Sequence, residues 1–437
     1  MPVRFVRLGI DYGTSTSKLV FRDPLAPGGE KAYPVLRDNS FRTSSSVVVT
    51  DKTLIFGCSP FTDGREIHGR WLESLKMRVA GEVTENYRKY CYGPLPALPE
   101  GLSAKDLAIL TVWFLLSEGT NAISRFLSYP VADLGITMTL GIPMSFYEDD
   151  VLRKTFLEIA LAARAIYHYC GRMTNGHIGH EEARSVLRER RELPMENGLA
   201  DIDVRNLVRS EAEAAMCLAV KSPAVNEGPF AEVDIGAGTT HASIFSILPQ
   251  FNGQRWLKER LAFFGARSEP FGMDAVDAAL AERQGIPRDN CLSLRGTERD
   301  AFRRVGVYRL VQTLESLREA YLLAWRRSVP KLHRPELESF KNHQVFVTGG
   351  GSLIPEIEAI FSRHPAGYEP RLQIRHLNKP HDLHSTNGRG IQLDDLPFMV
   401  VAYGLTFDAQ EVPETFTPRQ ITQANRPTAA RIDWEDM

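Results

Sequence analysis

The sequence predicts an α/β protein of two lobes, each built on a sheet that carries one copy of a repeated hairpin. The segments LGIDYGTSTSKLVF (8–21) and AEVDIGAGTTHASIF (231–245) repeat one pattern of strand, tight Asp/Gly/Thr turn and strand. The chain of 437 residues also exceeds what one hydrophobic core usually supports. Strand-like and helix-like segments alternate between and after the two hairpins, which is typical of α/β layers.

Bulk composition argues against several classes of protein. Charged residues make up 24% of the chain and the net charge is −2, so we expect no general attraction to nucleic acid or to a membrane. The five cysteines are scattered without a C-x-x-C pair, which favours a reducing compartment. The longest apolar run, 107–116, is about half the ~20 residues that a membrane span needs, and no secretory signal pattern opens the chain. We therefore expect a cytoplasmic protein.

β-structure dominates the part of the chain that follows the first hairpin. The apolar runs Val47–Thr50 and Leu54–Phe56 flank a polar turn and predict a further hairpin. Residues Cys58–Val79 have helical spacing, and the Pro- and Gly-rich segment 81–101 is expected to be a loop.

A buried helix and a strand–helix unit come next. Ser103 and Asp106 form a capping-box start for a helix over Ala104–Leu127, whose apolar centre must be buried. Ile136–Ile142 predicts a strand, and Glu148–Tyr169 has the spacing of an amphipathic helix. Two more helices are predicted, the charged Glu181–Glu192 and Arg209–Val220.

The second half repeats this alternation after its own hairpin. Phe271–Ala281 predicts the start of a helix, and Arg299–Arg327 predicts one long helix with leucines on its apolar side. Gln344–Thr348 predicts a buried strand, followed by the glycine turn Gly349–Gly351 and a helix. A strand, glycine turn and helix in this order can bring backbone close to a nucleotide. Phe398–Ala409 predicts a helix of small residues.

These elements divide the chain into four parts. We expect lobe I over 1–227, lobe II over 228–395 and a helix returning to lobe I over 396–412. The remaining residues, 413–437, contain several prolines and little periodic hydrophobicity. They are expected to form a flexible or loosely docked tail.

The turns of the two hairpins contain the residue types that bind phosphate and magnesium. A D-x-G-T turn offers backbone N–H groups and a hydroxyl to phosphate oxygens, and a carboxylate to a metal through water. Glycine is needed where the backbone must approach the anion. One such turn is common in proteins, whereas two of them followed by VTGGGS (347–352) form a more specific set.

The ordered motifs resemble those of a known superfamily. LGIDYGTSTSKLVF, EVDIGAGTTHASIF and VFVTGGGSLIPEIEAIF are similar to the phosphate-one, phosphate-two and adenosine motifs of the actin, sugar-kinase and heat-shock-chaperone ATPases. Segments between them, such as RTSSSVVVTDKTLIFG, SEAEAAMCLA and VVAYGL, most resemble the ATPase domain of the 70-kDa heat-shock chaperone. The resemblance covers about Leu8–Ala409, and no substrate-binding domain is expected after it. It implies an actin-like ATPase fold, in which two ribonuclease-H-like sheets flank a cleft for ATP or ADP and Mg²⁺.

The resemblance assigns metal-binding and catalytic roles residue by residue. Asp11 and Asp234 would hold magnesium through its water shell. Lys76 and Glu211 would place the γ-phosphate and the attacking water, with Asp234 and Thr239 completing the catalytic set. The phosphate-binding residues would be Gly13, Thr14, Ser15, Gly236, Gly238 and Thr239.

The same resemblance places the adenosine in the second lobe. Glu315 and Arg318 in ESLREA would lie beside the ribose and the adenine. The adenosine loop would be formed by Gly349, Gly350 and Gly351.

The sequence departs from the family pattern at several of these sites. His241 stands where the chaperones have a second aspartate, and Phe398 replaces an aspartate before the last helix. Leu353 replaces the arginine that packs on adenine, and Gly351 replaces the neighbouring serine. ATP binding is therefore a firmer expectation than efficient hydrolysis.

Our main hypothesis for the function is an ATPase switch related to the heat-shock chaperones. It would close its lobes around Mg-ATP and thereby regulate a protein partner, which the sequence does not identify; oligomers are compatible with it. An actin-like filament or segregation ATPase is one alternative, favoured by the triple glycine at 349–351. A small-molecule kinase of the same superfamily is another.

One further group of residues has enough donors for zinc. It consists of His168, Cys170, His177 and His180 in YHYCGRMTNGHIGH. Their spacing matches no zinc motif, so we interpret them as scattered surface and loop residues.

Overall fold

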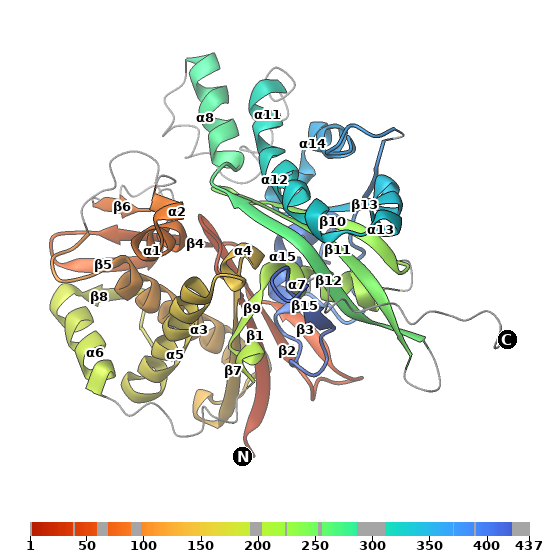
Figure 1. The fold of residues 1–437 in the computed structure, drawn as a ribbon. Helices are drawn as coiled ribbons and strands as arrows, with labels where there is room; N and C mark the ends of the chain where they lie inside the picture. Colours follow the sequence, from red (N-terminus) through yellow and green to blue (C-terminus); the bar gives the residue numbers. More distant parts are fainter. Residues whose placement is uncertain are drawn as a thin grey trace.

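The chain folds into two mixed β-sheets with helices packed around them (Figure 1). The structure is a computed structural model, and it describes residues 2–37, 40–58, 69–88, 98–192, 203–222, 225–251, 256–285, 311–369, 371–388 and 390–421. The predicted α/β class with two sheets is confirmed.

The first sheet is built around the first hairpin. Its nine strands follow the order β8-β5-β4-β2-β1-β7-β9, with β3 paired to β2 and β6 paired to β4. They are β1 Arg4–Asp11, β2 Thr16–Asp23, β3 Lys31–Pro34, β4 Thr43–Val49, β5 Thr53–Gly57, β6 Arg70–Leu72, β7 Leu134–Ile142, β8 His177–Gly179 and β9 Val208–Ser210. Strand β1 is antiparallel to β2 and parallel to β7.

The second sheet has the same arrangement of strands at its centre. Its strands follow the order β14-β13-β10-β11-β12-β15, and β10 is antiparallel to β11 and parallel to β13. They are β10 Gly228–Ile235, β11 Thr240–Phe251, β12 Trp256–Glu269, β13 Gln344–Thr348, β14 Gln373–Arg375 and β15 Glu414–Phe416. In both sheets the hairpin turn therefore follows a strand that is flanked by one antiparallel and one parallel neighbour.

Helices surround both sheets, as Figure 1 shows. In the first half they are α1 Leu75–Val83, α2 Glu85–Arg88, α3 Ala104–Leu127, α4 Met144–Tyr147, α5 Asp150–Cys170, α6 His180–Glu192 and α7 Glu211–Lys221. In the second half they are α8 Met273–Gln284, α11 Val311–Leu317, α12 Glu319–Ser328, α13 Arg334–Ser339, α14 Pro355–Phe361 and α15 Leu396–Gly404.

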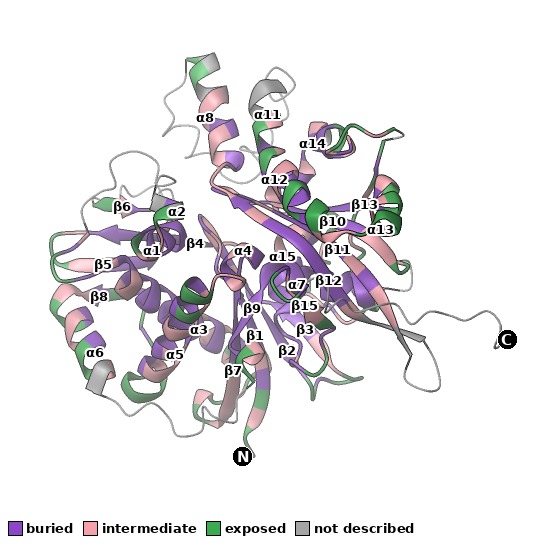
Figure 2. Cartoon of the chain, in the orientation of Figure 1, coloured by how far each residue is buried: buried purple, intermediate pink, exposed green. Residues whose placement is uncertain are grey.

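Helix α3 has the predicted bounds and the predicted start. The Ser103 side chain accepts a hydrogen bond from the Asp106 backbone N–H, and the Asp106 side chain accepts one from the Ser103 backbone. By length and hydropathy α3 could cross a membrane, but 78% of its most apolar window is buried within the protein. Figure 2 shows the buried interior formed by the sheets and helices. Packing against α5 and the strands of the first sheet accounts for the hydrophobicity of α3.

Two predicted helices were wrong in their bounds. Within Cys58–Val79, residues 59–68 lie outside the described residues, Arg70–Leu72 pair with β4 as strand β6, and the helix begins only at Leu75. Within Arg299–Arg327, residues 299–310 are not described, and the helix is interrupted at Arg318 between α11 and α12. Strand pairing and a tertiary contact of Arg318 override the local periodicity.

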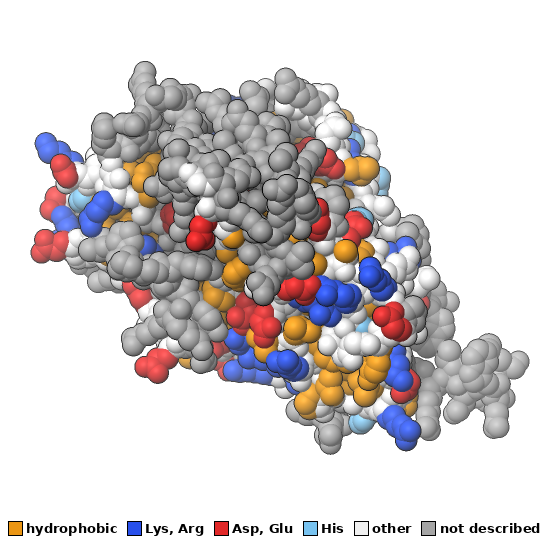
Figure 3. Space-filling model, turned by 90° about the horizontal axis from the view of Figure 1, so that it is seen from above, with side chains coloured by type: hydrophobic (Ala, Val, Ile, Leu, Met, Phe, Trp, Pro, Cys, Tyr) orange, Lys and Arg blue, Asp and Glu red, His pale blue; other side chains and the backbone are white. Residues whose placement is uncertain are grey.

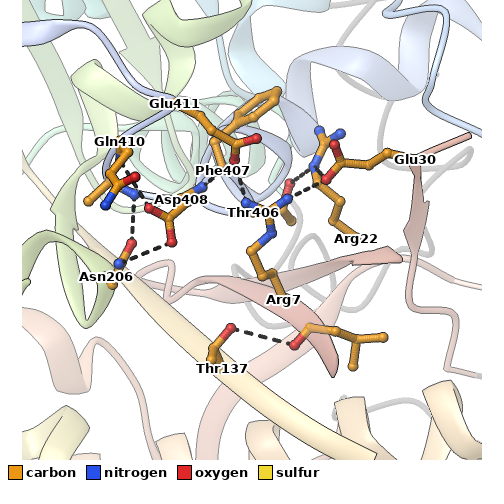
Figure 4. Close-up of polar contacts among 12 residues, drawn as sticks. Arg7, Arg22, Glu30, Thr137, Asn206, Thr406, Phe407, Asp408, Gln410 and Glu411 are labelled. Carbon is orange, nitrogen blue, oxygen red and sulfur yellow. Dashed lines mark hydrogen bonds and ion pairs between the residues drawn. The ribbon is translucent and has the colours of Figure 1, made fainter. Parts of the chain in front are cut away.

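The chain after α15 returns to the first sheet (Figure 4). Arg7 on β1 forms ion pairs with Glu30 and Glu411, and the buried Arg22 on β2 donates from Nε to Thr406 Oγ1 at 2.9 Å. Of the expected tail the structure describes 413–421, which includes strand β15 paired in parallel with β12.

The surface carries charges of both signs. Figure 3, which views the molecule from above, shows acidic and basic side chains interspersed over the described part of that face. The expected lack of attraction to nucleic acid and membranes stays a prediction.

A cluster of buried aromatic side chains between α12 and α14 contains two histidines. His343 is fully buried and His364 is 2% exposed. The Nε2 atom of His343 lies 2.5 Å from the Tyr321 hydroxyl, and its Nδ1 lies 2.6 Å from the Phe340 carbonyl oxygen. Burial lowers the pKa of each histidine to about 4.

We therefore expect the free energy of unfolding to fall as the pH drops below about 6.5. Because the folded-state pKa of both rings is depressed, the unfolded chain binds more protons between pH 6.5 and 4. The His343 ring should cost ~2 kcal/mol at pH 5, and the His364 ring should add to this cost in the same direction. Histidine NMR titration checks this, with His343→Gln and His364→Gln for assignment and urea unfolding at pH 7 and 5 for the energy. Rings that titrate near pH 6.5 would contradict it.

Candidate functional site

A cleft between the two sheets brings together residues from distant parts of the chain. It is lined by Asp11, Gly13, Thr14, Ser15, Thr16, Lys18, Arg42, Lys76, Glu211, Asp234, Gly236, Ala237, Thr239, His241, Met273, Gly349, Gly350, Pro397, Phe398 and Val401. Most of the residues predicted to bind nucleotide or metal are in this set. Gly238, Gly351, Glu315 and Arg318 are not.

The turns of the two hairpins touch each other at the base of the cleft. Thr14 Oγ1 lies 3.4 Å from Thr239 Oγ1. A Cβ atom on Gly238 would lie 2.7 Å from Thr14 Cγ2, so Gly238 allows this approach without lining the cleft. Ser15 Oγ also donates to Asp274 Oδ2 at 3.0 Å, which ties the first turn to the start of α8.

Two pairs of acidic and basic side chains lie in the cleft, and Asp234 belongs to neither. Lys18 Nζ lies 3.0 Å from Asp11 Oδ2, and Lys76 donates to Glu211 in a buried pair. Asp234 has no ion pair among the described residues. Its burial, together with the charges of Glu211 and Asp11, raises its pKa to about 7. A bound cation would relieve this repulsion.

Lys18 is a cleft residue that we did not predict. It is the cross-strand neighbour of Asp11, as His241 is of Asp234 in the second hairpin. The equal spacing of seven residues in both hairpins could have indicated it.

The imidazole of His241 lies among hydroxyl groups. Its Nε2 is 3.1 Å from Thr239 Oγ1, and its Nδ1 is 2.7 Å from Ser268 Oγ. Burial and the nearby Lys76 lower its pKa to about 3, so the ring is neutral at physiological pH. A neutral ring thus occupies the position where the resemblance implied a carboxylate.

The glycine turn after β13 lies directly against the second hairpin. Gly349 has φ +77°, and a Cβ atom there would overlap Asp234 Oδ1 and lie 2.5 Å from the Ile235 carbonyl oxygen. Gly351 is packed against the Ile235 side chain behind the cleft. Only a residue without a side chain fits at Gly349.

One end of the cleft is formed by an aromatic ring and a guanidinium group. The Cζ atom of Arg42 lies 4.5 Å from the centre of the Phe398 ring, and Phe398 also packs against Gly350. Arg42 was not assigned to the site, although it opens RTSSSVVVTDKTLIFG, one of the segments on which the resemblance depends. Leu353 lines a second cavity, not this cleft.

Glu315 and Arg318 lie away from the cleft lining. Glu315 forms an ion pair with Arg363, and Arg318 Nη2 donates to the carbonyl oxygens of Arg363 and His364 at 2.8 and 3.0 Å. Both side chains therefore hold the segment after α14. Their assignment to the ribose and adenine stays a prediction.

The cleft suits a cation that keeps its own water shell. In the described parts of the chain, no three His, Cys, Asp or Glu side chains are grouped to hold a metal, and this holds for His168, Cys170, His177 and His180. Magnesium retains several waters and needs only one or two carboxylates. Asp11 and Asp234 are two cleft-lining carboxylates on opposite hairpins, the number that such an ion needs.

Comparisons with known proteins do not identify the chain. No protein-family model matches the sequence, and no curated protein matches it. The functional assignment therefore depends on the motifs and on the geometry of the cleft.

Proposed function

We propose that the protein binds Mg-ATP in this cleft, has an actin-like ATPase fold and hydrolyses ATP as a slow switch. The observation that carries the proposal is the meeting of three glycine-containing turns, 12–15, 236–239 and 349–351, which are far apart in the sequence. Each sheet contributes one hairpin, and the central part of the strand pairing is repeated. Such a repeat agrees with the fold that the resemblance implies.

The side chains at the cleft have separate tasks in this proposal. Thr14, Ser15 and Thr239 offer hydroxyl groups to the phosphates, and the turns offer backbone N–H groups. Asp11 and Asp234 would hold magnesium through water, and the ion would neutralise charge on the phosphates. The residues contribute positioning and electrostatic stabilisation, which dominate phosphoryl transfer.

Lys76 and Glu211 would orient the attacking water. Their buried pair places an ammonium group and a carboxylate in the lining of the cleft, which also contains Asp234. The ammonium group can donate to the γ-phosphate while the carboxylate accepts a hydrogen bond from water. The neutral His241 removes one negative charge compared with the chaperone pattern, which favours binding over rapid hydrolysis.

The experiment that tests this proposal is calorimetric titration of the full chain with ATP and ADP. Both nucleotides should bind, and chelation of Mg²⁺ should weaken ATP binding at least ~10-fold, because a charge-assisted contact is lost. Asp234→Asn should weaken binding in Mg²⁺ to a similar extent. If neither ATP nor ADP binds, the proposal is rejected.

The output of the switch is proposed to be contact with a protein partner in the cytoplasm. Affinity purification in ATP and ADP is the corresponding measurement. A filament-forming ATPase is the second candidate, since the glycine turn favours it. Reversible light scattering on addition of ATP would support the filament. Consumption of ATP that requires a metabolite would instead indicate a kinase.

A further inference from the structure

A row of hydrogen-bonding side chains runs from the cleft into the protein. It begins at Thr14 and Thr239, continues through His241 and Ser268, and ends at Ser145 in α4. The last contact joins Ser268 Oγ and Ser145 Oγ at 2.5 Å. Tyr87 also hydrogen-bonds with Ser145. The row therefore links the turns of the two hairpins to Ser145 in helix α4.

Both ends of the row lie directly after strands of the first sheet. Thr14 lies between β1 and β2, and α4 follows β7, whereas the middle members lie on the second hairpin and β12. Thr239 is 3% exposed and Ser268 is 2% exposed. Water has little access to these two hydroxyl groups, so the directions of their hydrogen bonds are set by their neighbours.

The surroundings of His241 favour one tautomer. A neutral imidazole donates from one nitrogen and accepts at the other. Glu211 Oε2 lies 3.9 Å from Nε2. A hydrogen on Nε2 faces this carboxylate, while Nδ1 then accepts from the Ser268 hydroxyl. In this tautomer Thr239 Oγ1 accepts from Nε2–H, so the hydroxyl hydrogen of Thr239 points away from the ring, toward Thr14 and the cleft.

We propose that His241 is a positioning residue that makes the Thr239 hydroxyl a donor to a phosphate oxygen. It does so because Ser268, which is bonded to Ser145, occupies Nδ1 on the other side of the ring. The contact between α4 and β12 and the phosphate contact of Thr239 then form one hydrogen-bonded unit across the two sheets. This inference depends on the proposed function for the identity of the ligand.

The hydrogen-bonded row can be tested without nucleotide. NMR of the full chain with ¹⁵N-labelled histidine should show His241 as the Nε2–H tautomer at pH 7.5, with His241→Gln for assignment. Ser268→Ala should produce a mixture of tautomers, and Ser145→Ala a smaller change. Ser243→Ala is the matched control, since Ser243 is as buried as Ser268, lies on the neighbouring strand β11 and is outside the row. The Nδ1–H tautomer, or no change in Ser268→Ala, would overturn the proposal.

The phosphate contact is tested with Mg-ATP. Ser268→Ala should lower ATP affinity ~10-fold, the effect of misdirecting one hydrogen bond to a charged group, and Ser243→Ala should leave it unchanged. Thermal unfolding confirms that each variant is folded. An affinity change below ~2-fold would contradict the positioning role. If the wild-type protein binds no nucleotide, the proposed function is rejected. The NMR experiment still shows whether the hydrogen-bonded row exists.

Discussion

Replacing Lys76 with alanine should slow phosphate release from Mg-ATP by ~100-fold while the nucleotide still binds, because one preorganised donor to the transition state is lost. Lys76 is 2% exposed and pairs with Glu211 at the wall of the cleft. Single-turnover measurement of phosphate release gives the rate of the chemical step. Equal rates for the wild type and the variant would remove the assigned role.

The loss of a buried charge partner must be separated from the loss of catalysis. Lys76→Ala leaves the Glu211 carboxylate buried without its partner, which can cost ~3–5 kcal/mol of stability. The double variant Lys76→Met/Glu211→Gln removes both charges and should recover most of that stability without recovering the rate. Lys105→Ala is the surface control, since its pair with Glu158 is partly exposed. A double variant with wild-type activity would show that the pair is only structural.

Replacing Gly349 with alanine should abolish measurable nucleotide binding and destabilise the protein by ~2–4 kcal/mol. Two effects add at this position. The backbone of Gly349, with φ +77° and ψ 171°, is in a region that essentially only glycine adopts, and the new methyl group would overlap Asp234 Oδ1. Displacement of Asp234 would move one of the two carboxylates proposed to hold magnesium. Calorimetric titration with ATP and urea unfolding measure the two effects.

Gly367→Ala is the matched control for this variant. Gly367 has φ +75°, and a Cβ atom there would have nothing within 4 Å. The control should therefore show only the backbone strain of ~1–2 kcal/mol and normal ATP binding. If Gly349→Ala binds ATP as Gly367→Ala does, the close contact with Asp234 has no functional role.

Features that depend on near neighbours in the chain were accessible from the sequence. The capping box of α3 involves Ser103 and Asp106, three positions apart, and both of its hydrogen bonds are present. The two hairpins follow from apolar runs on each side of a glycine-containing turn, and each of them is found at the centre of a sheet. Local backbone preferences and cross-strand pairing are sufficient for such elements.

Features that depend on distant contacts were missed or displaced. Arg42 lies in the cleft lining against the ring of Phe398, which is more than 300 positions away in the sequence. The helix break at Arg318 coincides with hydrogen bonds to carbonyl groups of the segment after α14. Periodicity within a window contains no information on either contact.

The sequence alone determined the two Asp/Gly/Thr turns, the glycine turn at 349–351 and the capped helix α3, because a few consecutive residues set each of them. Only the tertiary structure decided how they meet: Thr14 lies against Thr239, Asp234 lies against Gly349, and His241 reaches Ser145 through Ser268. Strand order and register place these side chains together. Their contacts across the sheets could therefore not be derived from spacing along the chain.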